Sequence, residues 1–158
     1  MTADRSRVLV AERVPCGPAE AFARFTAEID RWWQPNPLFP FSAGRGGTLS
    51  FEAGEGGRLI ETYDDGSVFV IGVISTWAPP RLLVLSWRQA NFPPDFSTEL
   101  QVTFEPADLG QTRVTIEHYG WDGLPADHAA RHRFPLEVFQ LRFAEWWRGL
   151  LGAAFPPA

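Results

Sequence analysis

The apolar residues of the N-terminal stretch change their spacing around residue 15. Residues 7–14 (RVLVAERV) alternate between apolar and polar well enough to predict a first strand. Pro18 suits the first position of a helix, because the N–H group that proline lacks is not needed there. We therefore expect a helix over residues 18–25, followed by a second short helix over residues 26–34 that ends before Pro35.

Between residues 38 and 120 the period is two, which predicts an antiparallel sheet. Leu49, Phe51 and Ala53 give the first clear alternation. The sequences Asp65-Gly66, Pro79-Pro80 and Asp108-Leu109-Gly110 predict turns. They separate the remaining predicted strands, which are residues 58–63, 67–77, 81–87, 97–105 and 112–119.

The last part of the chain returns to helical spacing. Residues 125–133 predict a short polar helix, and Pro135 predicts a break before a long helix over residues 136–155. The long helix has one broad apolar face and an opposite face of Glu137, Gln140, Ala144 and Arg148. The apolar face consists of Leu136, Phe139, Phe143, Trp146, Trp147, Leu150 and Ala154.

Three pieces of the sequence carry a resemblance to a known family. They are residues 14–33 (VPCGPAEAFARFTAEIDRWW), the turn at residues 63–66, and residues 72–87, in which Trp77-Ala78-Pro79-Pro80-Arg81-Leu82 leads to Trp87. The chain resembles a START-like domain of the SRPBCC superfamily, and is similar to its bacterial subgroup related to the activator of Hsp90 ATPase.

This resemblance implies an α+β, helix-grip (START-like, Bet v 1-like) fold in a single domain over residues 1–158. In such a fold a curved antiparallel sheet wraps around a long C-terminal helix, with two short helices after the first strand. An elongated apolar cavity lies between the sheet and the helix. The activities of the superfamily vary widely, so the fold does not name the reaction.

Composition narrows the classes of partner. The net charge of −5 and the scattered arginines argue against a nucleic-acid partner. No apolar run approaches the roughly 20 residues of a membrane helix, and the N-terminus lacks a signal-peptide pattern, so we expect a cytoplasmic protein without membrane insertion. Cys16 is the only cysteine, which excludes an intrachain disulfide. Whether the chain forms a homodimer stays an open question.

His118 is the candidate catalytic residue. Alternation places it on the same face as Val114 and Ile116, which we expect to turn inward, where an imidazole could orient a ligand or act as a general acid or base. The alternative is a structural histidine that hydrogen-bonds to a neighbour at the strand end. Glu117 cannot be its local partner, because alternation sends it to the other face of the sheet.

The chain contains seven tryptophans and 13 phenylalanines, and large rings contribute heavily to binding surfaces. Glu61 and Arg88 are candidate polar anchors for a ligand, with surface ion pairing as the alternative. Phe92 and Phe96 flank Pro93-Pro94 in a loop and are candidates for the mouth of the cavity. The candidate aromatic contacts, for each of which a plain core position is the alternative, are Trp32, Trp33, Phe41, Phe51, Trp77, Trp87, Phe92, Phe96, Phe143 and Trp147.

No metal or cofactor is expected. His128 and His132 have the four-residue spacing of a helical metal site, but HAARH lacks the glutamate of a zinc-protease helix and no third ligand is evident. Residues 44–47 (GRGG) lack the lysine and the spacing of a phosphate-binding loop.

Three hypotheses for function stay open. The first is binding of a small apolar molecule, aromatic or acyl, without catalysis. The second is an enzyme similar to polyketide cyclases and aromatases, with His118 as the general acid or base. The third is a protein-interaction module, either co-chaperone-like or a toxin–antitoxin partner.

Overall fold

The computed structural model describes residues 7–33, 47–89, 92–93, 95–123 and 134–156. Seven strands and a long C-terminal helix make up most of this part of the chain. In chain order the elements are β1 (Val8–Val14), α1 (Pro18–Ala27), α2 (Ile29–Trp32), β2 (Thr48–Phe51), β3 (Arg58–Thr62), β4 (Val68–Ala78), β5 (Leu82–Trp87), β6 (Thr98–Pro106), η2 (Asp108–Gly110), β7 (Thr112–Tyr119), η3 (Trp121–Gly123) and α3 (Leu136–Ala154).

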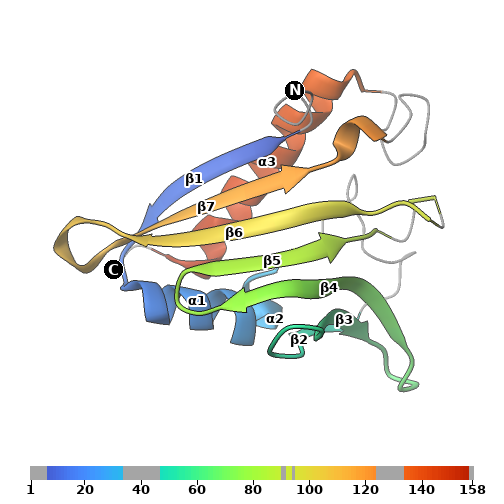
Figure 1. The fold of residues 1–158 in the computed structure, drawn as a ribbon, viewed down its shortest axis with the longest axis horizontal. Helices are drawn as coiled ribbons and strands as arrows, with labels where there is room; N and C mark the ends of the chain where they lie inside the picture. The colour runs from blue at the N-terminus through green and yellow to red at the C-terminus, as the bar shows by residue number, and fades with distance from the viewer. Residues whose placement is uncertain (1–6, 34–46, 90–91, 94, 124–133, 157–158) are drawn as a thin grey trace.

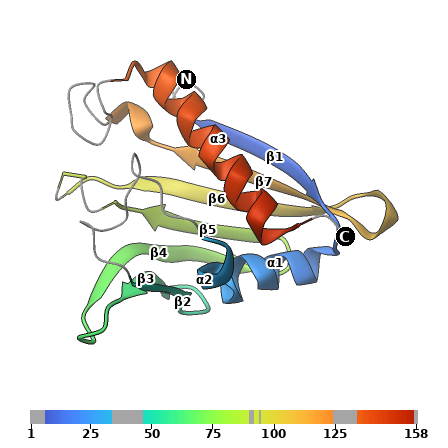
Figure 2. The same cartoon turned by 180° about the vertical axis from the view of Figure 1, so that it is seen from behind.

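The strands form one antiparallel sheet in the order β1-β7-β6-β5-β4-β3-β2. Strands β2 to β7 therefore follow one another as a meander, and β1 adds to the edge beside β7 (Figure 1). Consecutive strands can pair directly in this way because short turns suffice for antiparallel neighbours. The sheet curls, and its concave face receives the helices (Figure 2).

Helix α3 runs obliquely across the concave face on the side of β1, β7 and β6, and α1 and α2 lie against the same face (Figure 2). Every strand contributes buried residues to the concave face. On β5, β6 and β7, the buried inward positions are Leu83, Leu85, Trp87, Thr98, Leu100, Val102, Phe104, Thr112, Val114, Ile116 and His118. The structure thus has the helix-grip architecture that the sequence resemblance implied.

The turn between β3 and β4 has the local structure that its sequence predicts. Gly66 has a φ of 86°, in the left-handed region that favours glycine. Its N–H donates to the carbonyl of Tyr63 at 2.9 Å, and Asp65 Oδ1 accepts from the N–H of Ser67 at 2.9 Å. The Asp65-Gly66 sequence predicts this turn because Asp65 supplies a side-chain acceptor and Gly66 adopts the positive φ.

The helices differ from expectation in two details. Helix α1 runs on to Ala27 and the break comes at Glu28, so that α2 is only one turn long. Ala144 of α3, which the helical wheel placed opposite the apolar face, is buried. A helix beneath a curled sheet is covered on more than one side, which widens the face that it buries. The predicted helix at residues 125–133 lies outside the described residues.

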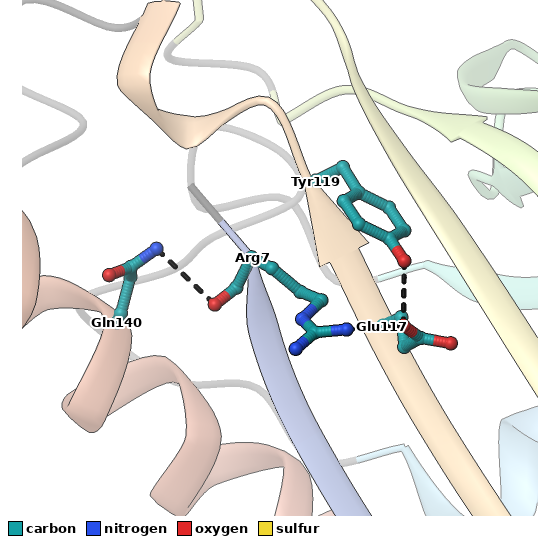
Figure 3. A network of polar contacts seen from close by, with 4 residues as sticks. All are labelled: Arg7, Glu117, Tyr119 and Gln140. Carbon is teal, nitrogen blue, oxygen red and sulfur yellow. Dashed lines mark hydrogen bonds and ion pairs between the residues drawn. The ribbon is translucent and has the colours of Figure 1, made fainter. Parts of the chain in front are cut away.

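Glu117 confirms the outward direction that alternation predicts for it. Its Oε2 accepts from Arg7 Nη1 at 3.0 Å and from the hydroxyl of Tyr119 at 2.6 Å (Figure 3). Gln140 of α3 donates to the carbonyl of Arg7 at 3.3 Å. These bonds join the edge strand β1 to β7 on one side and to α3 on the other.

None of the helices in the described part of the chain has the length and apolar character needed to cross a membrane.

Candidate functional site

His118 lies on the concave face near the end of β7 and is fully buried. Its Nε2 is 2.7 Å from Oγ1 of Thr98, on the neighbouring strand β6. The Thr98 hydroxyl in turn donates to the carbonyl of Trp87 at 3.2 Å. Because a hydroxyl has one hydrogen, this network assigns the imidazole hydrogen to Nε2 and leaves Nδ1 with a lone pair.

Aromatic rings surround the His118 imidazole. The ring centroids of Trp121, Phe143 and Trp87 lie 4.7, 5.2 and 5.3 Å from the centroid of His118. Burial in this setting lowers the pKa of His118 to about 3. The side chain is therefore neutral at neutral pH and can offer Nδ1 as a hydrogen-bond acceptor.

The aromatic cluster continues from β5 to α3. Trp147 lies 5.9 Å from Trp87, measured between ring centroids, and stacks on Phe25 of α1 at 6.3 Å. Trp33, at the end of α2, contacts the rings of Trp87 and Trp146 at 5.7 and 5.1 Å. We refer to six of these connected residues as the aromatic cluster: His118, Trp121, Phe143, Trp87, Trp147 and Trp33.

Three buried polar atoms of this cluster have no hydrogen-bond partner among the described residues. They are His118 Nδ1, Trp121 Nε1 and Trp147 Nε1. All three side chains are fully buried. The cluster thus holds one acceptor and two donors whose hydrogen-bonding capacity is unused.

The polar candidates have different surroundings. Glu61 is buried on the concave face of β3, and its Oε1 accepts from the hydroxyl of Tyr63 at 2.8 Å. Arg88 Nη1 donates to the carbonyls of Pro93 and Phe96 at 2.6 and 3.3 Å. Arg88 therefore holds the loop that follows β5.

The two rings of that loop pack together. The centroids of Phe92 and Phe96 are 5.2 Å apart, and Phe92 lies 5.7 Å from Trp121. Phe92 is buried and Phe96 half-buried. The loop therefore covers the end of the aromatic cluster at η3.

The remaining aromatic candidates lie outside the cluster as defined above. Trp32 is buried beside Phe25 and donates Nε1 to the carbonyl of Arg24 at 3.1 Å. Trp77 packs edge-on against Phe22 at 5.0 Å, near α1. Phe51 is half-buried against the core. Phe41 lies outside the described residues.

Sequence reasoning missed Thr98 and Trp121, which hold and cover His118. Alternation with Leu100 and Val102 already placed Thr98 on the inner face, next to β7, and this signal could have found it. Trp121 lies in the short helix η3 after the end of β7, where the apolar residues show no strand or helix periodicity.

Metal binding and cysteine catalysis find little support in the described residues. They contain no group of three His, Cys, Asp or Glu residues that could hold a metal ion. His128 and His132 are outside the described part. Burial raises the pKa of the Cys16 thiol, the opposite of the shift that activates a cysteine.

Two hollows on the surface are lined wholly by described residues. One, of about 600 Å³, lies over the outer face of β4 to β7 and includes Val73, Ser86 and Tyr119. The other, of about 290 Å³, lies by the β6–β7 turn and includes Arg13 and Arg113. Neither hollow includes a residue of the aromatic cluster.

Comparisons with solved structures support the fold. It is similar to Txn09, described as an anthrahydroquino-gama-pyrone synthase complexed with SUM, with 31% identity over 89% of this chain and 96% of that chain, at a TM-score of 0.54. It is also similar to CalC of Micromonospora echinospora, described as a self-sacrificing resistance protein, with 28% identity over 89% and 96% of the two chains and a TM-score of 0.55.

An HSP90 activator from Plasmodium falciparum shares the fold at a TM-score of 0.61, with 17% identity over 92% of this chain and 91% of that chain. A search of the curated proteins found no match. A model of the family described as Activator of Hsp90 ATPase homolog 1-like protein matches residues 16–150. Because this match covers most of the sequence, the chain belongs to the Activator of Hsp90 ATPase homolog 1-like family.

Proposed function

We propose that the protein binds a planar aromatic small molecule between the concave face of the sheet and α3. The observation that carries this proposal is the group of three unpartnered polar atoms in the aromatic cluster. Buried polar atoms in natural proteins are nearly always hydrogen-bonded, and one left without a partner costs about 1–3 kcal/mol. A ligand that supplies the partners would recover this cost.

The chemistry of the three atoms describes the ligand. The two indole N–H groups need acceptors, which carbonyl or ether oxygens provide. His118 Nδ1 needs a donor, which a hydroxyl provides. Because every member of the cluster except the half-buried Trp33 is buried, the ligand must part the rings on entry, and a flat aromatic molecule replaces the ring contacts that are lost.

Similarity to Txn09 supports the same class of ligand. Its name describes a synthase of a polycyclic aromatic product, and the likeness covers nearly all of that chain. A ligand of about 20 heavy atoms, at about 0.3 kcal/mol per atom, would bind with about −6 kcal/mol, which is a dissociation constant of tens of micromolar. Such an affinity is sufficient for carriage or sensing.

A cyclase-like reaction is the second candidate function, and the synthase relative favours it. His118 would then accept a proton from the substrate at Nδ1. Its low pKa opposes this role, since a general base works best when its pKa lies near the operating pH. Binding without catalysis is therefore the function that the site supports best.

Isothermal titration calorimetry with 2,6-dihydroxyanthraquinone tests the proposal, because this probe carries both carbonyl acceptors and hydroxyl donors. We expect saturable binding that Trp121→Phe weakens by about two- to tenfold, the usual value of one hydrogen bond. Trp32→Phe is the matched control, because the Trp32 indole already donates to Arg24. Absence of binding, or equal effects of both variants, would contradict the proposed site.

A further inference from the structure

Glu61 is a buried carboxylate on the concave face at the far side of the sheet from α3. It alternates with the fully buried Leu59, and its cross-strand neighbours are Leu49 on β2 and Phe69 on β4. Only 8% of the residue is exposed. A charged side chain in such apolar surroundings is costly unless it is paired.

The hydrogen bond from Tyr63 satisfies one oxygen of this carboxylate. Among the described residues, no arginine lies within ion-pair distance of Glu61. The arginines that form ion pairs in the described part of the chain pair with Glu20, Glu28, Glu52 and Glu117. Within the described part of the chain, the carboxylate of Glu61 therefore has the Tyr63 hydroxyl as a hydrogen-bond donor and no arginine as a countercharge.

The backbone of Gly47 lies close to the side chains of Glu61 and Tyr63. A Cβ atom added at Gly47 would lie 2.6 Å from Cγ of Glu61 and 3.0 Å from Cδ1 of Tyr63. Contacts this short leave no room for a side chain, so the glycine backbone packs directly against both residues. The carboxylate is therefore held in a fixed place by the fold.

The strand pairing connects Glu61 to the aromatic cluster. Phe69 pairs with Glu61, and the N–H of Arg88 donates to the carbonyl of Ile71, two residues further along β4. Trp87, next to Arg88, pairs with Thr98, the partner of His118. Both groups thus lie at the same end of the concave face, and Trp87 on β5 is two strand spacings of about 4.8 Å from Glu61 along the sheet.

We propose that Glu61, oriented by Tyr63, binds a positively charged amine on the aromatic ligand. This inference rests on the proposed function and adds a charged group to the ligand. An ammonium fits better than a hydroxyl because it supplies a countercharge to the carboxylate of Glu61. The ligand class is then an aromatic amine with the basic group at one end of a flat ring system.

Two probes that differ in one group test this inference. We would titrate the protein at pH 7 with 2-(aminomethyl)anthraquinone and 2-(hydroxymethyl)anthraquinone, by calorimetry. We expect the ammonium compound to bind the unmodified protein at least tenfold more tightly. Glu61→Gln should remove this preference and leave the affinity for the hydroxymethyl compound within about twofold.

Glu99→Gln is the matched control, because Glu99 is exposed on the outer face and its substitution changes the net charge equally. Tyr63→Phe should reduce the preference in part, as expected for a positioning residue. The preference of the unmodified protein for the ammonium over the hydroxymethyl compound is a test that needs no variant to fold.

The outcomes separate the two proposals. If both probes bind the unmodified protein with equal affinity, or Glu61→Gln keeps the preference, the amine site is wrong and the proposed function stands. If neither probe nor 2,6-dihydroxyanthraquinone binds, the proposed function is wrong, and the amine site is overturned with it.

Discussion

The hydroxyl of Thr98 joins two strands by bonding to two groups at once, His118 Nε2 at 2.7 Å and the Trp87 carbonyl at 3.2 Å. Thr98 pairs with Trp87 across β5 and β6, and His118 comes from β7. One buried hydroxyl thus fixes both the ring orientation and the tautomer of the histidine. The position of the unpartnered Nδ1 depends on it.

Thr98→Val should therefore destabilise the protein although it preserves shape. The substitution removes the hydroxyl that bonds to buried His118 Nε2 and to the Trp87 carbonyl, so we expect the free energy of unfolding to fall by about 1–3 kcal/mol in urea titrations. Thr98→Ser keeps the hydroxyl and should lose less. Equal stability of Thr98→Val and the unmodified protein would show that the hydroxyl does not hold the histidine.

The buried imidazole should also make stability depend on pH. Its pKa is lowered from 6.5 to about 3 in the folded protein, so below pH 6.5 the unfolded chain binds a proton that the folded chain does not. The free energy of unfolding therefore falls as pH drops from 6.5 towards 3, and the contribution is constant above this window. At pH 4.5 the loss is about 3 kcal/mol, from about 1.4 kcal/mol per pH unit.

Comparison with His118→Gln isolates this contribution, because the carboxylates common to both proteins cancel. Urea titrations at pH 7.5 and pH 4.5 should show the stability difference shifting by about 3 kcal/mol in favour of the variant at the lower pH. A difference that stays constant between the two pH values would mean that His118 titrates alike in the folded and unfolded chains.

Much of the fold could be predicted because local signals agree with the tertiary structure. The strand at residues 112–119 and the start of the long helix at Leu136 come out at the predicted residues. Alternation there reflects one inner and one outer face. The break at Glu28 and the burial of Ala144 could not be predicted, because they depend on how the helices pack against the curled sheet.

The candidate site was less accessible to sequence reasoning. Alternation gave the inward direction of His118 and the outward direction of Glu117. Alternation could not predict the hydrogen bond between His118 and Thr98. That bond depends on strand order and register, which are set by the whole sheet and not by the pattern within one strand. The contact between Trp121 and His118 depends on a turn of the chain after β7, which has no periodic signal.

The bond network of Glu117 should contribute little to stability. Glu117 and Arg7 are partly exposed, with 18% and 31% of their side chains accessible, so solvent screens their attraction. Glu117→Gln should lower the free energy of unfolding by at most about 1 kcal/mol in urea titrations at low salt. A loss of several kcal/mol would instead assign the attachment of β1 to this network.

Two glycines should respond to alanine with opposite signs. Gly66 has a φ of 86°, which an alanine adopts only with strain, so Gly66→Ala should destabilise the protein by about 1 kcal/mol. Gly149 lies inside α3, and a Cβ there would meet no atom within 4 Å. Gly149→Ala should therefore raise the free energy of unfolding by up to about 1 kcal/mol, because alanine is the better helix former. Thermal unfolding of both variants beside the unmodified protein checks the signs, and a destabilising Gly149→Ala would contradict a continuous α3 helix.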